Sequence, residues 1–172
     1  GDDQNKIADE IIEAWKEADL ILTTGGVSVG EKDLLPGVIE NLTGHVLFHG
    51  IQVKPGMPTM LSVVNGTPVL SLSGNPFAVE ALFEVLAGGY LTDMEASRYL
   101  QKNQMKILKQ TFVKTGKMKR IVKGRCDESG VYLPQIQKNG QLKNGIGSNC
   151  LVIFPEGERT YTEGEAVWVI RI

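Results

Sequence analysis

The sequence predicts an α/β domain followed by a small all-β domain. A helical pattern at residues 5–18 is followed by a short apolar run at 20–22, and a weaker helical pattern at 34–42 is followed by a second apolar run at 46–48. Helices that alternate with short apolar strands are typical of a parallel sheet covered by helices on both faces. After residue 106, short apolar runs alternate with glycines without a long helical pattern, which favours an all-β sandwich or barrel.

The composition is that of an ordinary globular protein. The 172 residues carry a net charge of −2, so we expect no nucleic acid or acidic membrane as a partner. No apolar run is long enough to span a bilayer, and no signal peptide is visible. Cys126 and Cys150 lie far apart and form no C-x-x-C pair, so we expect two buried thiols in a cytoplasmic protein.

The stretch from Thr23 to Asp33, T-T-G-G-V-S-V-G-E-K-D, connects the first apolar run to the second helix. Glycines let a ligand approach the backbone closely, and a helix that starts at about Asp33 would point its free N–H groups toward the loop. We therefore interpret the stretch as an anion cradle, most often a phosphate site. Its spacing matches neither G-x-G-x-x-G nor the Walker motif, and a tight β–α connection without a ligand is the alternative. The groups of the predicted cradle are Gly25, Gly26 and Gly30 with the hydroxyls of Thr23, Thr24 and Ser28.

A second strand–turn–helix unit follows. Apolar runs at 59–64 and 68–72 flank Asn65-Gly66, which is a strong hairpin signal. The second run leads into Ser73-Gly74-Asn75-Pro76 and a long helix, where Asn75 either caps the helix or contacts a ligand through its amide. Because ligands bind at the carboxyl ends of parallel strands, the two turns are expected to face one pocket. The apolar stripe of the long helix consists of Val79, Leu82, Phe83, Leu86 and Tyr90.

Lys54 and Asp33 are the charged residues with the clearest chemical interpretation. Two prolines and a glycine within residues 52–58 predict a stiff loop, in which Lys54 is either a fixed point charge for an oxyanion or a solvated surface lysine. Asp33 stands at the mouth of the cradle, where it would suit a Mg²⁺ ion that bridges carboxylate and phosphate, or would simply cap the helix. Asp2 and Asp3 are expected to begin the first helix.

Two other kinds of site are not supported. His45 and His49 flank a predicted strand without a third ligand, so a zinc site is not expected. Neither Ser28 nor Ser73 has a partnered base in the sequence, so a hydrolase triad is not supported either.

A polar stretch between residues 92 and 106 predicts the domain boundary, with the α/β domain at 1–100 and the β domain at 105–172. The strands expected in the β domain are 107–113, 119–125, 131–136, 151–154 and 166–172.

Three motifs, T-T-G-G-V-S-V-G-E-K-D, V-K-P-G-M-P and S-G-N-P-F-A-V-E, occur in this order. Together they resemble the molybdopterin molybdenumtransferase family, MoeA, which also includes the E domain of gephyrin. The resemblance runs over nearly the whole chain, weakens after Lys106, and corresponds to the C-terminal half of a family member. It implies part of a three-layer parallel-sheet domain, shared with the MogA-like molybdopterin adenylyltransferases, followed by a β-barrel.

The resemblance implies insertion of molybdate into adenylylated molybdopterin (molybdopterin-AMP), with release of AMP and a requirement for Mg²⁺. It implies catalytic roles for Asp33, Lys54 and Asp3, and metal binding by Asp33 and Asp2. The implied cofactor-binding residues are Thr24, Gly25, Gly26, Val27, Ser28, Gly30, Pro55, Gly56, Gly74, Asn75 and Pro76.

The chain departs from the family pattern in three places. Met57 stands where a second lysine is usual, Ser73 replaces a proline, and the T-G-[DE]-E-L segment is absent. The chain also opens directly on Gly1 and a helix, as if cut from a longer protein. We therefore expect it to be inactive alone, and to form a homodimer or associate with the missing N-terminal part.

Two alternative functions stay open. A molybdopterin adenylyltransferase-like enzyme would share the glycine loop, although the K-P-G-x-P loop and the β module argue against it. A non-catalytic molybdopterin-binding or scaffold module would have kept the fold without the missing charged groups.

Overall fold

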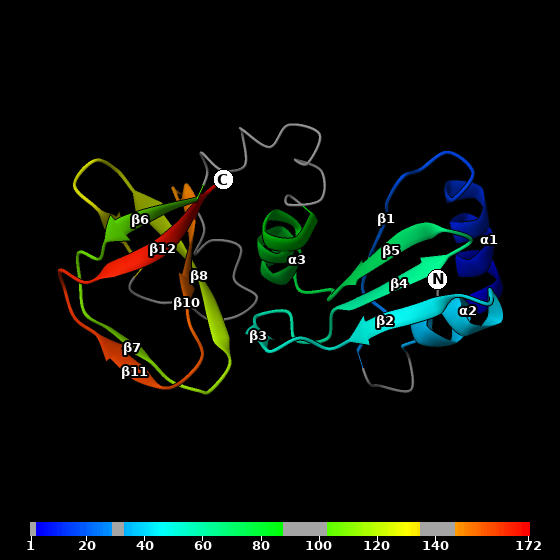
Figure 1. Cartoon of the computed structure of the whole chain (residues 1–172), viewed down its shortest axis with the longest axis horizontal. Helices are drawn as coiled ribbons and strands as arrows, with labels where there is room; N and C mark the ends of the chain where they lie inside the picture. Colours follow the sequence, from blue (N-terminus) through cyan, green and yellow to red (C-terminus); the bar gives the residue numbers. More distant parts are fainter. Residues whose placement is uncertain (1–2, 29–32, 88–102, 135–146) are drawn as a thin grey trace. The chain divides into compact units, whose positions relative to one another are not determined.

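A computed structural model describes residues 3–28, 33–87, 103–134 and 147–172 (Figure 1). The chain forms two compact units, Gly1–Ile51 with Gly56–Val79 and Gln52–Pro55 with Glu80–Ile172. The second unit thus includes a short piece of the V-K-P-G-M-P loop. The domain boundary predicted after residue 100 falls at the edge of segment 88–102, outside the described residues, and stays a prediction. None of the described helices is long and apolar enough to cross a bilayer.

The first unit contains one mixed sheet and two complete helices. Its four strands lie in the order β1-β5-β4-β2, in which β1 and β5 are parallel and the other neighbours are antiparallel. The α/β class with parallel pairing is confirmed, but the sheet is mixed because a hairpin joins β4 to β5. The elements are α1 (Gln4–Ala14), β1 (Ile21–Thr24), α2 (Leu35–Asn41), β2 (His45–His49), β4 (Met60–Val64) and β5 (Thr67–Leu72).

The hairpin predicted from Asn65-Gly66 is confirmed. Val64 of β4 lies opposite Thr67 of β5, so the turn has two residues. Both have positive φ, 49° at Asn65 and 85° at Gly66. This pair of angles is typical of the type I′ turn, whose twist matches that of the strands it joins.

Helices α1 and α2 supply the apolar partners of one sheet face. Asp3 caps α1, because its Oδ1 accepts a hydrogen bond from Asn5 N at 3.0 Å. The amphipathic pattern of this first helix is confirmed by the side chains that it buries. The core of the unit consists of Ile11, Ile21, Val27, Leu35, Val38, Ile39, Met60, Val64 and Val69.

Three predictions for residues 1–100, the predicted α/β domain, need correction. The run 46–48 is not a buried strand: β2 is the last strand of the sheet, and Val46 and Leu47 are 47% and 61% exposed. The helix after the cradle begins at Leu35 rather than at about Asp33. The loop around Lys54 is not wholly irregular, because Val53–Lys54 forms a short strand, β3.

A helix follows Asn75 as predicted. α3 (Pro76–Leu82) continues into a π-helical turn, η1 (Phe83–Ala87). Tyr90, the last residue of the predicted apolar stripe, lies outside the described residues.

Apart from the helical residues 80–87, the described elements of the second unit are strands, as predicted for the β domain. A six-stranded sheet has the order β3-β8-β10-β12-β6 with β9 paired to β8, and β7 and β11 form a two-stranded sheet. No described strand of one sheet pairs with a strand of the other, so the expected closed barrel is not found among the strands that the structure describes. The strands are β3 (Val53–Lys54), β6 (Asn103–Ile107), β7 (Phe112–Lys114), β8 (Lys119–Cys126), β9 (Val131–Tyr132), β10 (Cys150–Phe154), β11 (Arg159–Tyr161) and β12 (Ala166–Arg171).

The strands predicted at 119–125, 151–154 and 166–172 correspond to β8, β10 and β12. The strand predicted at 107–113 is instead divided between β6 and β7, and β11 was not predicted. Of the strand predicted at 131–136, β9 covers the first two residues, and residues 135–136 lie outside the described part of the chain. The core is built on alternating residues of the central strands and on Phe154, whose ring stacks on Phe112 at 4.5 Å.

Candidate functional site

The predicted cradle lies at the carboxyl ends of the two parallel strands of the first unit. Thr24 of β1 lies opposite Leu72 of β5, and Gly25 N donates a hydrogen bond to Leu72 O at 2.9 Å. The chain then turns at Gly25 and Gly26, whose φ angles of 83° and 64° are readily adopted only by glycine. The two glycines therefore decide where the chain leaves the sheet.

The S-G-N-P turn that follows β5 lies against this glycine turn. A Cβ atom built on Gly74 would lie 3.5 Å from the Cα of Gly25, so the two backbones are nearly in contact. Both turns therefore meet at one edge of the sheet in the first unit, while the expectation that they face one pocket stays a prediction. A side chain at position 74 would stand between them.

A cavity of about 260 Å³ opens beside the glycine turn. The hydroxyl of Thr23 in its wall is buried and has no hydrogen-bond partner among the described residues, and the same holds for Ser71, its neighbour in the strand register. A buried hydroxyl without a partner is costly, and an acceptor atom of a ligand would relieve that cost. The cavity is lined by Ile7, Thr23, Thr24, Gly25, Gly26, Leu34 and Leu35.

The loop that forms the cradle is anchored at two points. Leu35 N donates to Gly26 O at 3.2 Å, and His49 Nε2 lies 2.7 Å from Val27 O. Val27 is 1% exposed, so its side chain belongs to the core and only its backbone can reach a ligand. Thr24 and Ser28 are both exposed, and Thr24 also lines the cavity, so both can offer a hydroxyl to a ligand. Gly30 lies outside the described residues.

Asn75 caps the helix that follows its turn. Its Oδ1 accepts from Ala78 N at 3.1 Å, and Asn75 N donates to Ser73 Oγ at 3.3 Å. This is the capping alternative considered from the sequence, and it leaves the amide nitrogen of Asn75 as the group for a ligand. Gly74 and Pro76, the other two predicted residues of this turn, are exposed.

The predicted acidic residues occupy different settings. Asp3 is the N-cap of α1, while the residue at the N-cap of α2 is Leu34, so Asp33 does not cap that helix. Asp33 is half-buried and directly precedes Leu34, which lines the cradle cavity. Asp2 lies outside the described residues.

Lys54 belongs to the second unit, where it lies beside a second positively charged residue on the neighbouring strand. β3 runs parallel to β8, and Lys54 lies opposite Arg120 in the register. Arg120 was not anticipated, because 66 positions separate the two residues and only the pairing of β3 with β8 brings them together. Pro55 and Gly56 are buried, and Met57, at the position of the usual second lysine, is 46% exposed.

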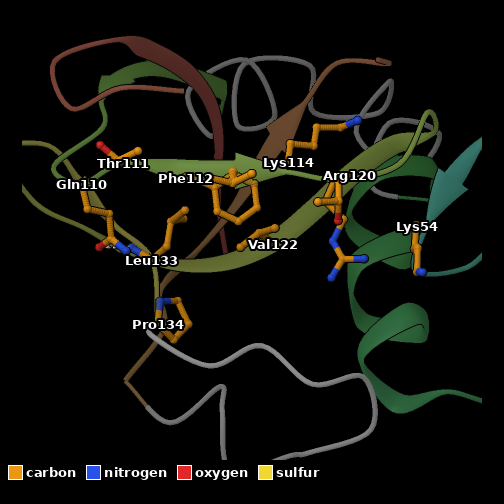
Figure 2. Close-up of a pocket in the computed structure, with 11 residues that line it drawn as sticks. Lys54, Gln110, Thr111, Phe112, Lys114, Arg120, Val122, Leu133 and Pro134 are labelled. Carbon is orange, nitrogen blue, oxygen red and sulfur yellow. Dashed lines mark hydrogen bonds between the residues drawn. The ribbon is translucent and has the colours of Figure 1, made fainter. Parts of the chain in front are cut away.

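Two adjoining pockets surround this cation pair in the second unit, with volumes of about 480 Å³ and about 180 Å³. No carboxylate of the described residues lines either pocket, and Figure 2 shows the larger of the two. The larger is lined by Lys54, Gln110, Thr111, Phe112, Val113, Lys114, Thr115, Arg120, Val122, Leu133 and Pro134, and the smaller by Lys54, Thr115, Gly116, Lys117, Met118 and Arg120.

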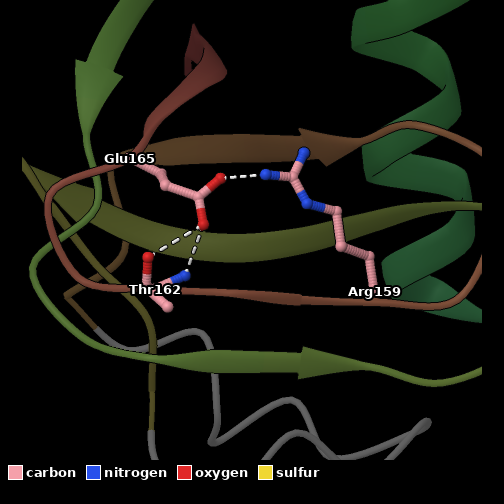
Figure 3. A network of polar contacts seen from close by, with 3 residues as sticks. All are labelled: Arg159, Thr162 and Glu165. Atoms are coloured by element: carbon pink, nitrogen blue, oxygen red, sulfur yellow. Dashed lines mark hydrogen bonds and ion pairs between the residues drawn. The ribbon is translucent and has the colours of Figure 1, made fainter.

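Arg120 is half-buried, whereas the other described arginines of the unit are exposed. Burial lowers the pKa of its guanidinium, and it forms no ion pair within the part of the chain that the structure describes. Arg159, by contrast, pairs with Glu165, which also accepts from Thr162 N at 2.7 Å and Thr162 Oγ1 at 3.0 Å (Figure 3). The bonds from Thr162 and then the charge of Arg159 lower the pKa of Glu165. The charge of Arg159 is therefore already balanced by Glu165, whereas the guanidinium of Arg120 can still bind an anion.

The two cysteines are buried and free, as predicted. Burial and the neighbouring Cys126 raise the pKa of Cys150 to about 12, which keeps it protonated and unreactive at neutral pH. Within the described residues, no group of three or more His, Cys, Asp or Glu side chains could hold a metal ion by itself.

The chain is similar in sequence and in structure to several known proteins. A family model described as a probable molybdopterin binding domain matches residues 1–93. Molybdopterin molybdenumtransferase from Bacillus subtilis (strain 168) is 31% identical over 183 residues, and that from Staphylococcus aureus (strain COL) is 29% identical over 174 residues. They match 97% and 98% of this chain, and the chain spans 42% of each relative. The crystal structure of the molybdopterin biosynthesis MoeA protein from Pyrococcus horikosii aligns over 98% of this chain and 41% of its own, with 26% identity and a TM-score of 0.79.

Proposed function

The chain belongs to the molybdopterin binding domain family, and on that premise we propose that it takes part in molybdenum cofactor biosynthesis as the molybdopterin-binding part of a molybdopterin molybdenumtransferase. The reaction proposed is insertion of molybdate into adenylylated molybdopterin with release of AMP. Because the chain spans 42% of the curated relatives, we propose further that it needs the remaining part of such a protein for turnover.

The observation that carries the proposal is the meeting of the two turns at the ends of β1 and β5. Gly25 and Gly74 bring the backbones together, and Thr23 offers a buried hydroxyl that has no hydrogen-bond partner among the described residues. Backbone N–H groups and hydroxyls in such a turn favour phosphate oxygens, and molybdopterin-AMP carries a pyrophosphate. Under this proposal the cradle holds the phosphate groups of that substrate.

The second part of the proposal assigns the molybdate oxyanion to the smaller pocket of the second unit. Lys54, Lys117 and Arg120 line that pocket, and their three positive charges would outweigh the two negative charges of a dianion. Molybdate needs no protein nucleophile: positioning and charge stabilisation are the contributions expected of the enzyme. The proposed catalytic role of Lys54 is therefore electrostatic.

Magnesium fits the residues of the first unit only as a bridging ion. Mg²⁺ is commonly held by one or two carboxylates together with substrate phosphates and water, and Asp33 is a carboxylate beside a residue of the cradle wall. Asp33 would hold the ion, and Asp2 is the second ligand proposed from the sequence. When bound, the ion would neutralise phosphate charge during transfer.

The proposal extends to assembly and location. β1 and β2 end the four-stranded sheet among the described residues, and Val46 and Leu47 of β2 are exposed. Such strand edges pair readily with another chain, which supports a homodimer or an association with an N-terminal part. Two free buried thiols are usual in a reducing compartment, which supports a cytoplasmic location.

The test is AMP release from adenylylated molybdopterin and molybdate, with the chain joined to or mixed with an N-terminal part from a relative. We expect Asp33→Asn to weaken use of metal or molybdate more than binding of the pterin. We expect Lys54→Ala to weaken binding of the anionic substrate by about 1–3 kcal/mol, as for one lost charge-assisted bond.

Three results would contradict the proposal. AMP release by both variants at the rate of the parent protein would show that Asp33 and Lys54 do not have these roles. AMP transfer to molybdopterin in place of AMP release would favour an adenylyltransferase. Tight molybdopterin binding without any turnover would favour a binding or scaffold module.

A further inference from the structure

His49 lies at the same edge of the first unit's sheet as the cradle, although it belongs to β2, the described strand farthest from β1 (Figure 1). β2 and β5 are both antiparallel to β4, and β5 is parallel to β1, so β1, β5 and β2 run in the same direction. The carboxyl end of β2 is His49, which therefore lies at the edge where the two turns begin. There its Nε2 is 2.7 Å from Val27 O of the cradle loop.

We propose that His49 is a positioning residue of the cradle: through Val27 O it orients the backbone N–H of Ser28 toward a phosphate oxygen. The inference deepens the proposed function and rests on its assignment of the phosphate groups to the cradle. The role of His49 is indirect, because its Nε2 is already used by the loop. This role does not depend on molybdate or on the pockets of the second unit.

The bond to the loop decides which nitrogen of the imidazole carries the proton. Val27 O is a carbonyl oxygen and can only accept a hydrogen bond, so His49 Nε2 is the donor. In the neutral ring, Nδ1 is then without a proton. The neutral side chain is thus confined to the Nε2–H tautomer, which NMR can detect.

The backbone of His49 is itself fixed by strand pairing. In the register of β2 and β4, His49 lies opposite Met60, which is 0% exposed. The N–H of the next residue, Gly50, donates to Thr59 O at 2.8 Å. The imidazole therefore starts from a position that the sheet determines, and a group held on a strand positions its partner more precisely than one held on a loop.

Two contacts fix the peptide group between Val27 and Ser28. The side chain of Val27 is 1% exposed and packs in the core of the unit, while its carbonyl oxygen is held by His49. The C=O and N–H of a planar trans peptide group point in opposite directions, so the N–H of Ser28 points away from His49. No acceptor in the described part of the chain takes a hydrogen bond from Ser28 N. This N–H thus remains available to a ligand.

The direction of this N–H matters because none of the described residues that line the cradle cavity is positively charged. An anion held there depends on backbone N–H groups and hydroxyls. Ser28 offers both, because its side chain is exposed. Without the bond from His49, the peptide group would be free to rotate, and a carbonyl oxygen turned toward the anion would repel it.

The experiment titrates the 172-residue chain with inorganic pyrophosphate and follows isotope-labelled backbone amides by NMR. His49→Leu removes the donor, whereas His49→Gln keeps an N–H donor separated from Cα by the same number of bonds. His45→Leu is the matched control, because His45 is the other histidine of β2 and is exposed. The amide of Val122, a residue of the larger pocket, reports any binding in the second unit and should titrate alike in all variants.

We expect His49→Leu to weaken pyrophosphate binding, measured at the Ser28 amide, about fivefold, which is the effect of one lost hydrogen bond. His49→Gln should restore the affinity to within about twofold of the parent, and His45→Leu should change it by less than about twofold. The ring nitrogen signals of the parent should show the Nε2–H tautomer of His49. A purely structural role would instead lower the free energy of unfolding, measured in urea, without changing the affinity of the folded protein.

The possible results separate this inference from the proposed function. Parental affinity at Ser28 in His49→Leu, or an equal loss in His49→Gln, would overturn the role of His49 and leave the phosphate assignment of the cradle intact. The Nδ1–H tautomer in the parent protein would also overturn the inference alone. Pyrophosphate that shifts Val122 but not Ser28 in the parent would overturn the assignment of phosphate to the cradle, and the inference with it.

Discussion

The cradle of the first unit and the cation pair of the second are built to hold anions by different means. Among the residues that the structure describes, the cradle is lined by glycines, hydroxyls and apolar side chains and by no charged side chain. The pockets of the second unit depend on Lys54 and Arg120, which lie on strands far apart in sequence. Backbone donors are fixed by the conformation of one turn, whereas side-chain charges are placed by strand pairing. The two sites should therefore respond differently to substitution, salt and pH.

The largest effect is expected from Gly25→Ala in the cradle. A left-handed conformation costs a residue with a Cβ about 1–2 kcal/mol, and the added Cβ would point into open space where the anion is expected. We expect phosphate binding at this site, measured by NMR titration, to fall at least tenfold. Gly66→Ala is the matched control, because Gly66 has a φ of 85° in the same unit and also faces open space. Equal loss of binding in both variants would show that strain alone is responsible.

Lys54→Met tests the other side of the comparison. Loss of one cation of the pair should weaken anion binding in the second unit by about 1–3 kcal/mol and leave the cradle unchanged. Because this site depends on net charge, raising the salt concentration should reduce the difference between variant and parent. Calorimetric titration with molybdate at two salt concentrations measures both effects. The same substitution at exposed Lys119 serves as the control, and an equal loss there would contradict a specific role for Lys54.

Lys114→Met should affect stability more than binding. Its Nζ joins the turn at Gly116 to the turn at Gly157, and Gly157 N donates to Lys117 O at 2.8 Å. Removing the ammonium leaves two carbonyl groups without this donor, for which we expect a loss of about 1–2 kcal/mol in the free energy of unfolding. Urea denaturation measures the loss, with Lys119→Met as the surface control. A stable variant with unchanged unfolding would show that water replaces the lysine.

The smallest effect concerns pH and is confined to the second unit, which holds both cysteines. Burial and then Cys126 raise the pKa of Cys150 from 9.0 to about 12, so the folded state keeps a proton that the unfolded state loses. The contribution of this thiol to stability is thus complete below about pH 9 and declines as pH rises toward about 12. Urea midpoints between pH 8 and pH 10 should fall less in Cys150→Ala than in the parent protein. Parallel pH curves for the two proteins would contradict the assignment.

Features that depend on neighbouring residues were predictable from the sequence. Asn65-Gly66 specifies its own turn because both residues tolerate positive φ, and Asp3 caps α1 because its side chain reaches a backbone N–H two residues on. The glycines of the cradle were identifiable for the same reason. Two of the predicted site residues, Asp2 and Gly30, lie outside the described part of the chain, and the roles of the others stay predictions.

Features that depend on distant pairing were decided only by the tertiary structure. The run 46–48 is apolar enough for a buried strand, but among the described strands β2 has a neighbour on one side only, and Val46 and Leu47 are exposed. Lys54 was recognisable as a candidate, yet Arg120 was not, because alternation along β8 does not reveal which strand will lie beside it. The sequence by itself determined the turns, caps and glycines, whose conformations follow from a few adjacent residues. The tertiary structure decided the edges and the cation pair, because strand order and register depend on contacts between segments that the sequence leaves far apart.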